Sequence, residues 1–257
     1  MRYLMIALVF MACNQFSTGT APRLSTEWVD TVKTNSYAGV IKPEIFETAF
    51  FHDTPVTGHD TLPGFFAVNI GKINIESGKI IACDPVVMSD AKPYTQEFPR
   101  GQFPVHLAIA QFNSDQRVAF SRILFSDKPV VKWEFALPEG EKQLPLFGDS
   151  SYSYGVDAGI GLFIDAKANA AFDSLRNKDG RLWEKVFIHQ MEKRTHITWQ
   201  YMLYGFGDYN LAAFTTGVGD GSYSTYVGYD DKGQVCRLLT DFGLVNWWKP
   251  GTPGATH

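Results

Sequence analysis

Residues 211–241 read LAAFTTGVGDGSYSTYVGYDDKGQVCRLLTD, and no other stretch indicates the fold class as clearly. Apolar and β-branched runs at 211–215, 222–229 and 234–241 alternate with segments rich in Gly and Asp. This pattern is typical of strands joined by turns. The last turn, at 230–233, ends in a glycine that can take a positive φ. The C-terminal third is therefore predicted to form an antiparallel meander.

Five further runs upstream have the composition of strands. The first two are separated only by the tripeptide Glu-Ser-Gly at 76–78, which is the pattern of a hairpin. In the last, Val131, Trp133 and Phe135 alternate with polar residues, as in a strand with one buried face. The predicted strands cover residues 65–75, 79–83, 103–112, 118–125 and 130–136.

Two segments near 165–194 have helical periodicity instead. Apolar residues recur on one face of 165–177 and of 181–194, and an Asp-Gly pair separates the segments. Residues 44–51 fit either a helix or a strand. Since 25–245 contains no internal repeat and no linker, residues 25–257 are predicted to form a single globular domain. The expected fold class is α+β: mostly antiparallel β-sheet, sandwich-like or a meander, with two adjacent helices near 165–194.

The composition excludes one class of partner. The net charge is −4, and no basic run is longer than Lys193-Arg194. Nucleic-acid binding needs a cationic stripe that neutralises phosphates, so we expect no nucleic-acid partner. The 20 Phe, 11 Tyr and 6 Trp, together with 23 Gly and 13 Pro, favour strands and turns.

The first thirteen residues have the order of an export signal. Arg2 supplies a positive start, residues 3–11 are uncharged and apolar, and Ala12-Cys13 follows. This arrangement resembles the lipobox of bacterial lipoproteins, in which the cysteine is acylated and becomes the mature N-terminus. The resemblance implies a signal segment at 1–12 and a lipid on Cys13. A plain secretory signal, or an apolar start that packs as a strand, is the alternative.

After Cys13 the residues are small and polar, which is typical of a linker. Residues 13–24 are expected to form a tether that holds the domain beside a membrane without crossing it. Residue 14 is Asn, not Asp, and in lipoproteins this implies the periplasmic side of the outer membrane if the cell has two membranes. The expected location is the bacterial cell envelope.

A family resemblance rests on several phrases in a fixed order. They are SGKIIACDP at 77–85, PRGQFPV at 99–105, WEFA at 133–136, VDAGIG at 156–161 and GVGDGSY at 217–223. Together they resemble an uncharacterised bacterial family known as domain of unknown function 4241, over roughly residues 65–245. The resemblance implies a single domain and carries no established activity.

Cys83 is one candidate for chemistry. It precedes Asp84 and Pro85, and His106 on a later strand could activate it as a nucleophile. The simpler interpretation is a thiol buried in the core. If Cys13 is acylated, Cys83 and Cys236 could instead form a disulfide outside the cytoplasm.

Carboxylates are the second candidate, and three or more converging on one point would bind Ca²⁺ or Mg²⁺. The simpler interpretation is that Asp beside Gly or Pro shapes a turn; an Asp84 of this kind should tolerate Asn with little loss. No resident cofactor is predicted, and a divalent cation is the alternative. The candidate ligands are Asp84, Asp157, Asp165, Asp220 and Asp241.

The leading hypothesis is a non-catalytic, membrane-tethered binding domain outside the cytoplasm, of the immunity type by analogy with other β-rich bacterial domains, with a protein partner. The candidate binding residues are Asp157, Asp220, Tyr223 and Tyr226, with Tyr229, Trp247 and Trp248 as further aromatics that could form an interface. The alternative is an extracytoplasmic hydrolase that uses Cys83 and His106 or a carboxylate-bound cation. Asp84 would serve either form of the hydrolase.

Overall fold

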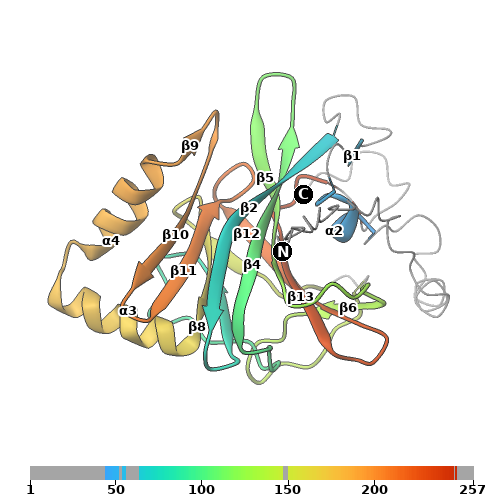
Figure 1. Ribbon diagram of the computed structural model, residues 1–257, viewed down its shortest axis with the longest axis horizontal. Helices are drawn as coiled ribbons and strands as arrows, with labels where there is room; N and C mark the ends of the chain where they lie inside the picture. Colours follow the sequence, from blue (N-terminus) through green and yellow to red (C-terminus); the bar gives the residue numbers. More distant parts are fainter. Residues whose placement is uncertain (1–43, 52–53, 56–63, 147–149, 246, 248–257) are drawn as a thin grey trace, which may run out of the picture.

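The computed structural model describes residues 44–51, 54–55, 64–146, 150–245 and 247. Two antiparallel sheets pack face to face, and helices cover the two outer faces of this sandwich (Figure 1). α3 and α4 lie at one end, and the short α2 lies at the other. The expected α+β class is confirmed, in its sandwich-like form.

The larger sheet has eight strands in the order β1-β2-β4-β5-β13-β12-β6, with β7 paired to β12 beside β6. Every pair in it is antiparallel. The strands are β1 (Thr54–Pro55), β2 (Gly64–Ile75), β4 (Gly101–Gln111), β5 (Gln116–Leu124), β6 (Lys132–Phe135), β7 (Tyr154–Val156), β12 (Gly221–Tyr229) and β13 (Val235–Asp241).

The smaller sheet has five strands in the order β3-β8-β11-β10-β9, again all antiparallel. The strands are β3 (Ile80–Cys83), β8 (Ile160–Asp165), β9 (Thr195–His196), β10 (Trp199–Phe206) and β11 (Tyr209–Thr215). The strand positions predicted from sequence are therefore largely confirmed, whereas two of the predicted pairings are wrong.

The predicted hairpin of β2 and β3 does not form, because the chain changes sheet at 76–78. The Oδ2 atom of Asp165, at the end of β8, accepts hydrogen bonds from the backbone N–H groups of Glu76 (3.1 Å) and Ser77 (2.8 Å). It also accepts one from the Ser77 hydroxyl at 2.6 Å. Asp165 therefore holds this corner beside β8, and β3 pairs with β8 instead of β2.

The predicted C-terminal meander is confirmed for β12 and β13, which pair, but it is wrong for β11, which belongs to the smaller sheet. The chain crosses between sheets at 216–220, where Gly217 has a φ of +40°. A Cβ atom at this position would lie 2.7 Å from the carbonyl oxygen of Phe242. A run of strands and turns in sequence does not distinguish this crossover from a hairpin.

The two helices expected near 165–194 are confirmed. α3 spans Ala166–Lys178 and is capped by Asp165, whose Oδ1 atom accepts a hydrogen bond from the Lys167 amide at 2.9 Å. α4 (Leu182–Glu184) continues directly into a π-helical turn, η1 (Lys185–Gln190). α2 spans Ile45–Thr48. The helices formed by the described residues are too short or too polar to cross a bilayer.

Three buried layers hold these elements together. The inner layer, between the sheets, includes Ile73, Leu107 and Phe214. One outer layer packs α3, α4 and η1 on the smaller sheet through residues such as Phe172. The other packs α2 on the larger sheet, where the Phe46 ring lies 4.5 Å from Trp247 and 5.1 Å from Trp133, centroid to centroid. This last face also carries three buried charged residues, Glu47, Arg122 and Arg237.

Candidate functional site

The structure does not bring Cys83 and His106 together. Cys83 lies on β3 in the layer under α3, whereas His106 lies on β4 in the other sheet and faces Arg122, its neighbour on β5. Burial, together with Arg122 and Arg237, lowers the pKa of His106 to about 4. The proposed nucleophile–base pair is therefore corrected, since the two residues belong to opposite sides of the sandwich.

Cys83 also lacks the environment of a nucleophile. Burial, and then the charge of Asp84, raise the pKa of its thiol far above the ordinary value. A pocket of about 340 Å³ borders Cys83, but its lining contains no histidine. The disulfide considered as an alternative does not form either, because Cys83 and Cys236 are both free and buried in different layers.

Asp84 shapes a turn, as the simpler interpretation predicted. Its side chain is 1% exposed, and both carboxylate oxygens accept backbone hydrogen bonds. Oδ1 accepts from Val86 at 2.6 Å, and Oδ2 accepts from Asp157 at 2.7 Å and Ala158 at 2.8 Å. Asp84 thus joins the end of β3 to the turn between β7 and β8.

The five candidate metal ligands have separate roles. Asp157 is exposed, Asp165 caps α3, and Asp220 accepts a hydrogen bond from the Gly159 amide at 3.0 Å. In the part of the chain that the structure describes, no three His, Cys, Asp or Glu side chains group as metal ligands would. Convergence of these carboxylates on one cation, the geometry required for the metal-dependent form of the hydrolase, is therefore not found.

A cluster that the sequence analysis missed lies under α2. Glu47 is 7% exposed and makes a two-pronged ion pair with Arg237, with Nε to Oε1 at 2.9 Å and Nη2 to Oε2 at 3.1 Å. Arg122 reaches the same carboxylate at 3.5 Å and lies over the Phe50 ring at 3.9 Å. Burial and Arg237 lower the pKa of Arg122 to about 10, against the opposite effect of Glu47. This cluster fastens α2 to β5 and β13.

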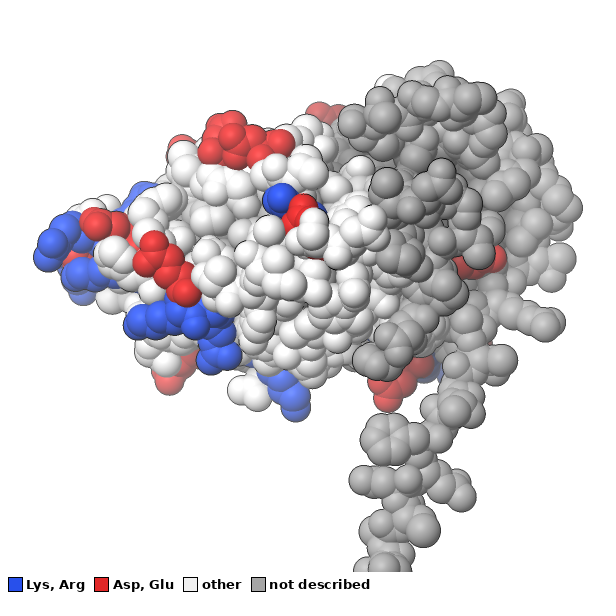
Figure 2. All heavy atoms as spheres, turned by 90° about the horizontal axis from the view of Figure 1, so that it is seen from above, with Lys and Arg blue, Asp and Glu red and all other residues white. Residues whose placement is uncertain are grey.

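The charges on the surface are mixed. On the face shown in Figure 2, Lys and Arg are interspersed with Asp and Glu near the end of the molecule that carries α3 and α4. No continuous basic band crosses the described residues on that face. This face therefore offers no cationic track for a phosphate backbone.

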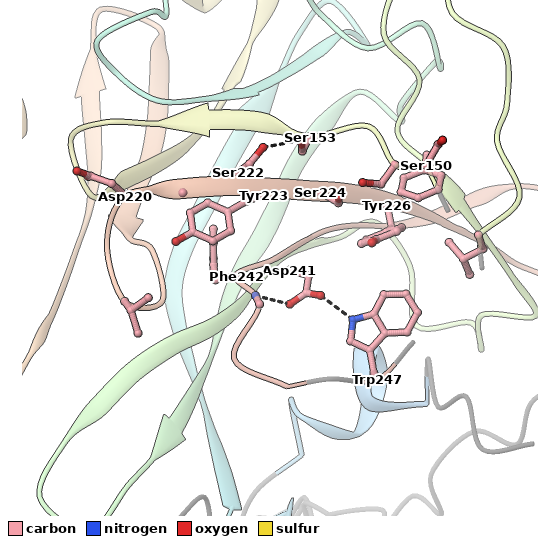
Figure 3. Close-up of a pocket in the computed structure, with 16 residues that line it drawn as sticks. Ser150, Ser153, Asp220, Ser222, Tyr223, Ser224, Tyr226, Asp241, Phe242 and Trp247 are labelled. Carbon is pink, nitrogen blue, oxygen red and sulfur yellow. Dashed lines mark hydrogen bonds between the residues drawn. The ribbon is translucent and has the colours of Figure 1, made fainter. Parts of the chain in front are cut away.

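A pocket of about 380 Å³ opens at the end of the larger sheet, where β13 stops at Asp241 (Figure 3). Ser222, Ser224 and Tyr226 alternate along β12 and so lie on one face of the sheet. Ser150, Ser151 and Ser153 come from the segment before β7, and the Oγ atoms of Ser153 and Ser222 lie 2.6 Å apart. Further lining residues are Phe135, Leu146, Val218, Asp220, Gly221, Tyr223, Phe242, Gly243 and Trp247.

Asp241 points into this pocket with two neutral hydrogen-bond donors (Figure 3). The Gly243 amide donates to Oδ1 at 2.9 Å, and the Trp247 indole N–H donates to Oδ2 at 2.6 Å. Burial raises the pKa of Asp241 to about 6, although both hydrogen bonds act in the opposite direction. Perturbed carboxyl groups in pockets are typical of functional sites.

The aromatic candidates do not form an exposed patch. Tyr223, Tyr226 and Trp247 are 6%, 5% and 5% exposed, and Tyr229 is half-buried. Tyr223 and Tyr226 nevertheless line the pocket. Trp248, Cys13 and the rest of the expected signal and tether lie outside the described residues.

Sequence reasoning brought Asp220, Tyr223, Tyr226, Asp241 and Trp247 into consideration, but not as one site, and it missed the serines. The alternation of Ser222, Ser224 and Tyr226 was a signal that these residues share a face.

Comparison with known proteins supports the resemblance noted in the sequence. A family model described as Protein of unknown function (DUF4241) matches residues 73–240, from within β2 nearly to the end of β13. The matched segment includes the serines of β12 and ends one residue before Asp241. No curated protein and no solved structure matches the chain. On the strength of the match over most of both sheets, the chain belongs to the family Protein of unknown function (DUF4241).

Proposed function

We propose that this protein is a non-catalytic binding domain of the bacterial cell envelope, and that the pocket at the end of β12 and β13 is its binding site. The observation that carries the proposal is the lining of this pocket, in which hydroxyl groups and aromatic rings surround a partly buried carboxylate, Asp241. Ligand sites commonly combine apolar walls with a few placed polar groups in this way.

The same lining favours binding over hydrolysis. A serine nucleophile needs a general base within hydrogen-bond reach. The partner of Ser153 is another serine, Ser222, and the residues described around the pocket include no His, Cys, Lys or Arg. Asp241 is occupied by two donors that hold it in place, which suits recognition.

A fragment screen tests the proposal. ¹⁵N-resolved NMR spectra of the full-length protein would be recorded with a library of small polar and aromatic fragments. We expect hits whose shifts map to β12 and to the residues around Asp241. Filling the pocket by Ser224→Phe should abolish these shifts. The matched control is Ser174→Phe, at an exposed position on α3, which should leave them unchanged.

Two outcomes would contradict the proposal. One is a screen without any hit at the pocket. The other is a set of hits that survive Ser224→Phe while the variant keeps the wild-type spectrum elsewhere, because binding would then lie outside the pocket.

We also propose that the domain is held at the membrane by a lipid on Cys13, with residues 14–24 as the tether. The support is the order of charge, apolar run and small residue before Cys13. Metabolic labelling with a palmitate analogue should mark the wild-type protein and fail to mark Cys13→Ser. Equal labelling of the two would contradict the lipid anchor and leave the pocket proposal untouched.

A further inference from the structure

The charged residues that line the described pocket are all acidic. Among the lining residues, the groups that ionise are the carboxyls of Asp220 and Asp241 and the phenols of Tyr223 and Tyr226. Burial raises the pKa of both phenols, so they stay neutral at ordinary pH. Within the described ranges, no Lys, Arg or His forms an ion pair with Asp241. The described pocket thus carries negative charge without a described countercharge.

Asp241 has the capacity to accept more hydrogen bonds. An ionised carboxylate offers about four lone-pair positions, and the two described donors, from Gly243 and Trp247, use one on each oxygen. Because the group is partly buried, a cation beside it would gain more from the electrostatic attraction than it would at an exposed carboxylate.

The apolar walls suit the remainder of such a ligand. The rings of Phe135 and Tyr226 lie 5.0 Å apart, and those of Tyr226 and Trp247 lie 5.6 Å apart at 81°, centroid to centroid. Aromatic faces attract cations and pack against apolar stems. The hydroxyls of Ser222 and Ser224 can accept the remaining hydrogen bonds of an ammonium group.

We propose that this pocket recognises a primary ammonium group on a short apolar or aromatic stem, with Asp241 as its ionic partner. The inference rests on the proposed binding function and names the class of ligand. The ammonium could belong to a free amine or to a lysine side chain. Phosphates and carboxylates are excluded by repulsion from Asp220 and Asp241.

The experiment compares two probes of similar shape, benzylamine and benzyl alcohol, titrated into the protein at pH 7.5 and low salt and followed by NMR. We expect benzylamine to bind at least about ten-fold more tightly than benzyl alcohol. Asp241→Asn should remove this preference. The matched control is Asp231→Asn, an exposed position in the turn at the other end of the β12–β13 hairpin, which should keep it.

A second measurement needs no variant. Since Asp241 has a pKa of about 6, benzylamine should bind more weakly as the pH falls from 7 to 5, while benzyl alcohol should not. The titratable groups that interact with Asp241 are Tyr223 and Tyr226 on β12. Burial, and then the charge of Asp241, raise the pKa of Tyr226. The other carboxyl in the lining, Asp220, accepts a hydrogen bond from the Gly159 amide. Both phenols stay neutral in this range, so the change in affinity reports the charge of Asp241, and salt should weaken the benzylamine complex.

A third arm separates the two sources of the ammonium group. N-acetyl-lysine methylamide is compared with its norleucine counterpart. Tighter binding of the lysine compound would assign the site to a lysine side chain of a protein, whereas binding of benzylamine alone would assign it to free amines.

The outcomes distinguish the inference from the function on which it rests. Equal binding of benzylamine and benzyl alcohol, or pocket hits in the fragment screen without benzylamine among them, would overturn the ammonium inference and leave the binding function in place. No binding of any probe or fragment at the pocket would overturn both.

Discussion

Glu47 and Asp241 are acidic side chains that lie against the same outer face of the larger sheet, and they differ in their partners. Glu47 meets two buried guanidinium groups, from Arg122 and Arg237. Asp241 meets a backbone amide and an indole, both neutral. The comparison separates two uses of a buried carboxylate. Glu47, with its countercharge in the chain, joins elements of the fold; Asp241, which has two neutral donors and borders a pocket, can accept the charge of a ligand.

The largest effect is expected at Glu47. Replacing it by Gln would leave two buried arginines without their carboxylate, and removing one partner of a buried ion pair costs about 3–5 kcal/mol. The free energy of unfolding, measured by urea denaturation, should fall by that amount. Glu76→Gln is the control, because its ion pair with Lys167 has side chains that are 45% and 57% exposed, and such pairs contribute about 1 kcal/mol or less.

If Glu47→Gln cost no more than Glu76→Gln, the cluster under α2 would not be a structural junction. The proposed difference in role between Glu47 and Asp241 would then be contradicted.

The next effect concerns Asp84, a buried carboxylate held by amides alone. Because both of its oxygens accept backbone hydrogen bonds, Asn can replace only one of them. These hydrogen bonds therefore favour a larger loss than the sequence alone led us to expect. Hydrogen bonds to a charged group contribute about 1.5–3 kcal/mol each, and we expect Asp84→Asn to lower the free energy of unfolding by about 2–3 kcal/mol.

Thermal or urea unfolding measures this change, with Asp157→Asn as the control in the β7–β8 turn that Asp84 contacts, where the side chain is exposed. Equal stability of Asp84→Asn and Asp157→Asn would show that the amides around Asp84 do not depend on its charge.

The smallest effect is a pH dependence at Asp241. Its pKa is about 6 in the folded protein and about 3.9 in an unfolded chain. Between these values the folded state binds more protons, so the free energy of unfolding should fall as the pH rises from about 4 to about 6. Each pKa unit corresponds to about 1.4 kcal/mol, and partial exposure reduces the total to about 1–2 kcal/mol.

Asp241→Asn should lack this part of the pH profile. The measurement is the difference in unfolding free energy between variant and wild type at pH 4 and pH 7, where the variant should gain relative to wild type at the higher value. Parallel profiles would show that the pKa of Asp241 is the same in the folded and the unfolded state.

Much of the secondary structure could be predicted from sequence because it depends on local patterns. The period-two alternation at 130–136 and the helical periodicity at 165–177 both gave the observed elements, β6 and α3. The predictions that failed concerned which strands pair with one another. The turn at 76–78 looks like a hairpin turn, but its amides bind Asp165, which is 89 positions from Glu76.

For the candidate site, too, local patterns could be predicted from sequence, whereas contacts between distant segments could not. Sequence patterns brought Asp220, Tyr223, Tyr226 and Asp241 into consideration. Ser222 and Ser224 were missed, although their alternation along β12 is the pattern of residues that share one face. The sequence patterns did not show that the Trp247 indole N–H would donate a hydrogen bond to Asp241. Nor did they show that Glu47 would form an ion pair with Arg237, which is 190 positions away.

The sequence by itself determined the fold class, the strand and helix positions and the family, because each depends on residues that are near one another along the chain. Tertiary structure decided which strands pair, which faces are buried and which charges are neutralised. The physical reason is that the pKa of Asp241 and the burial of Glu47 depend on solvent exclusion and on distances between atoms. Those quantities exist only after segments far apart in the chain have packed against one sheet.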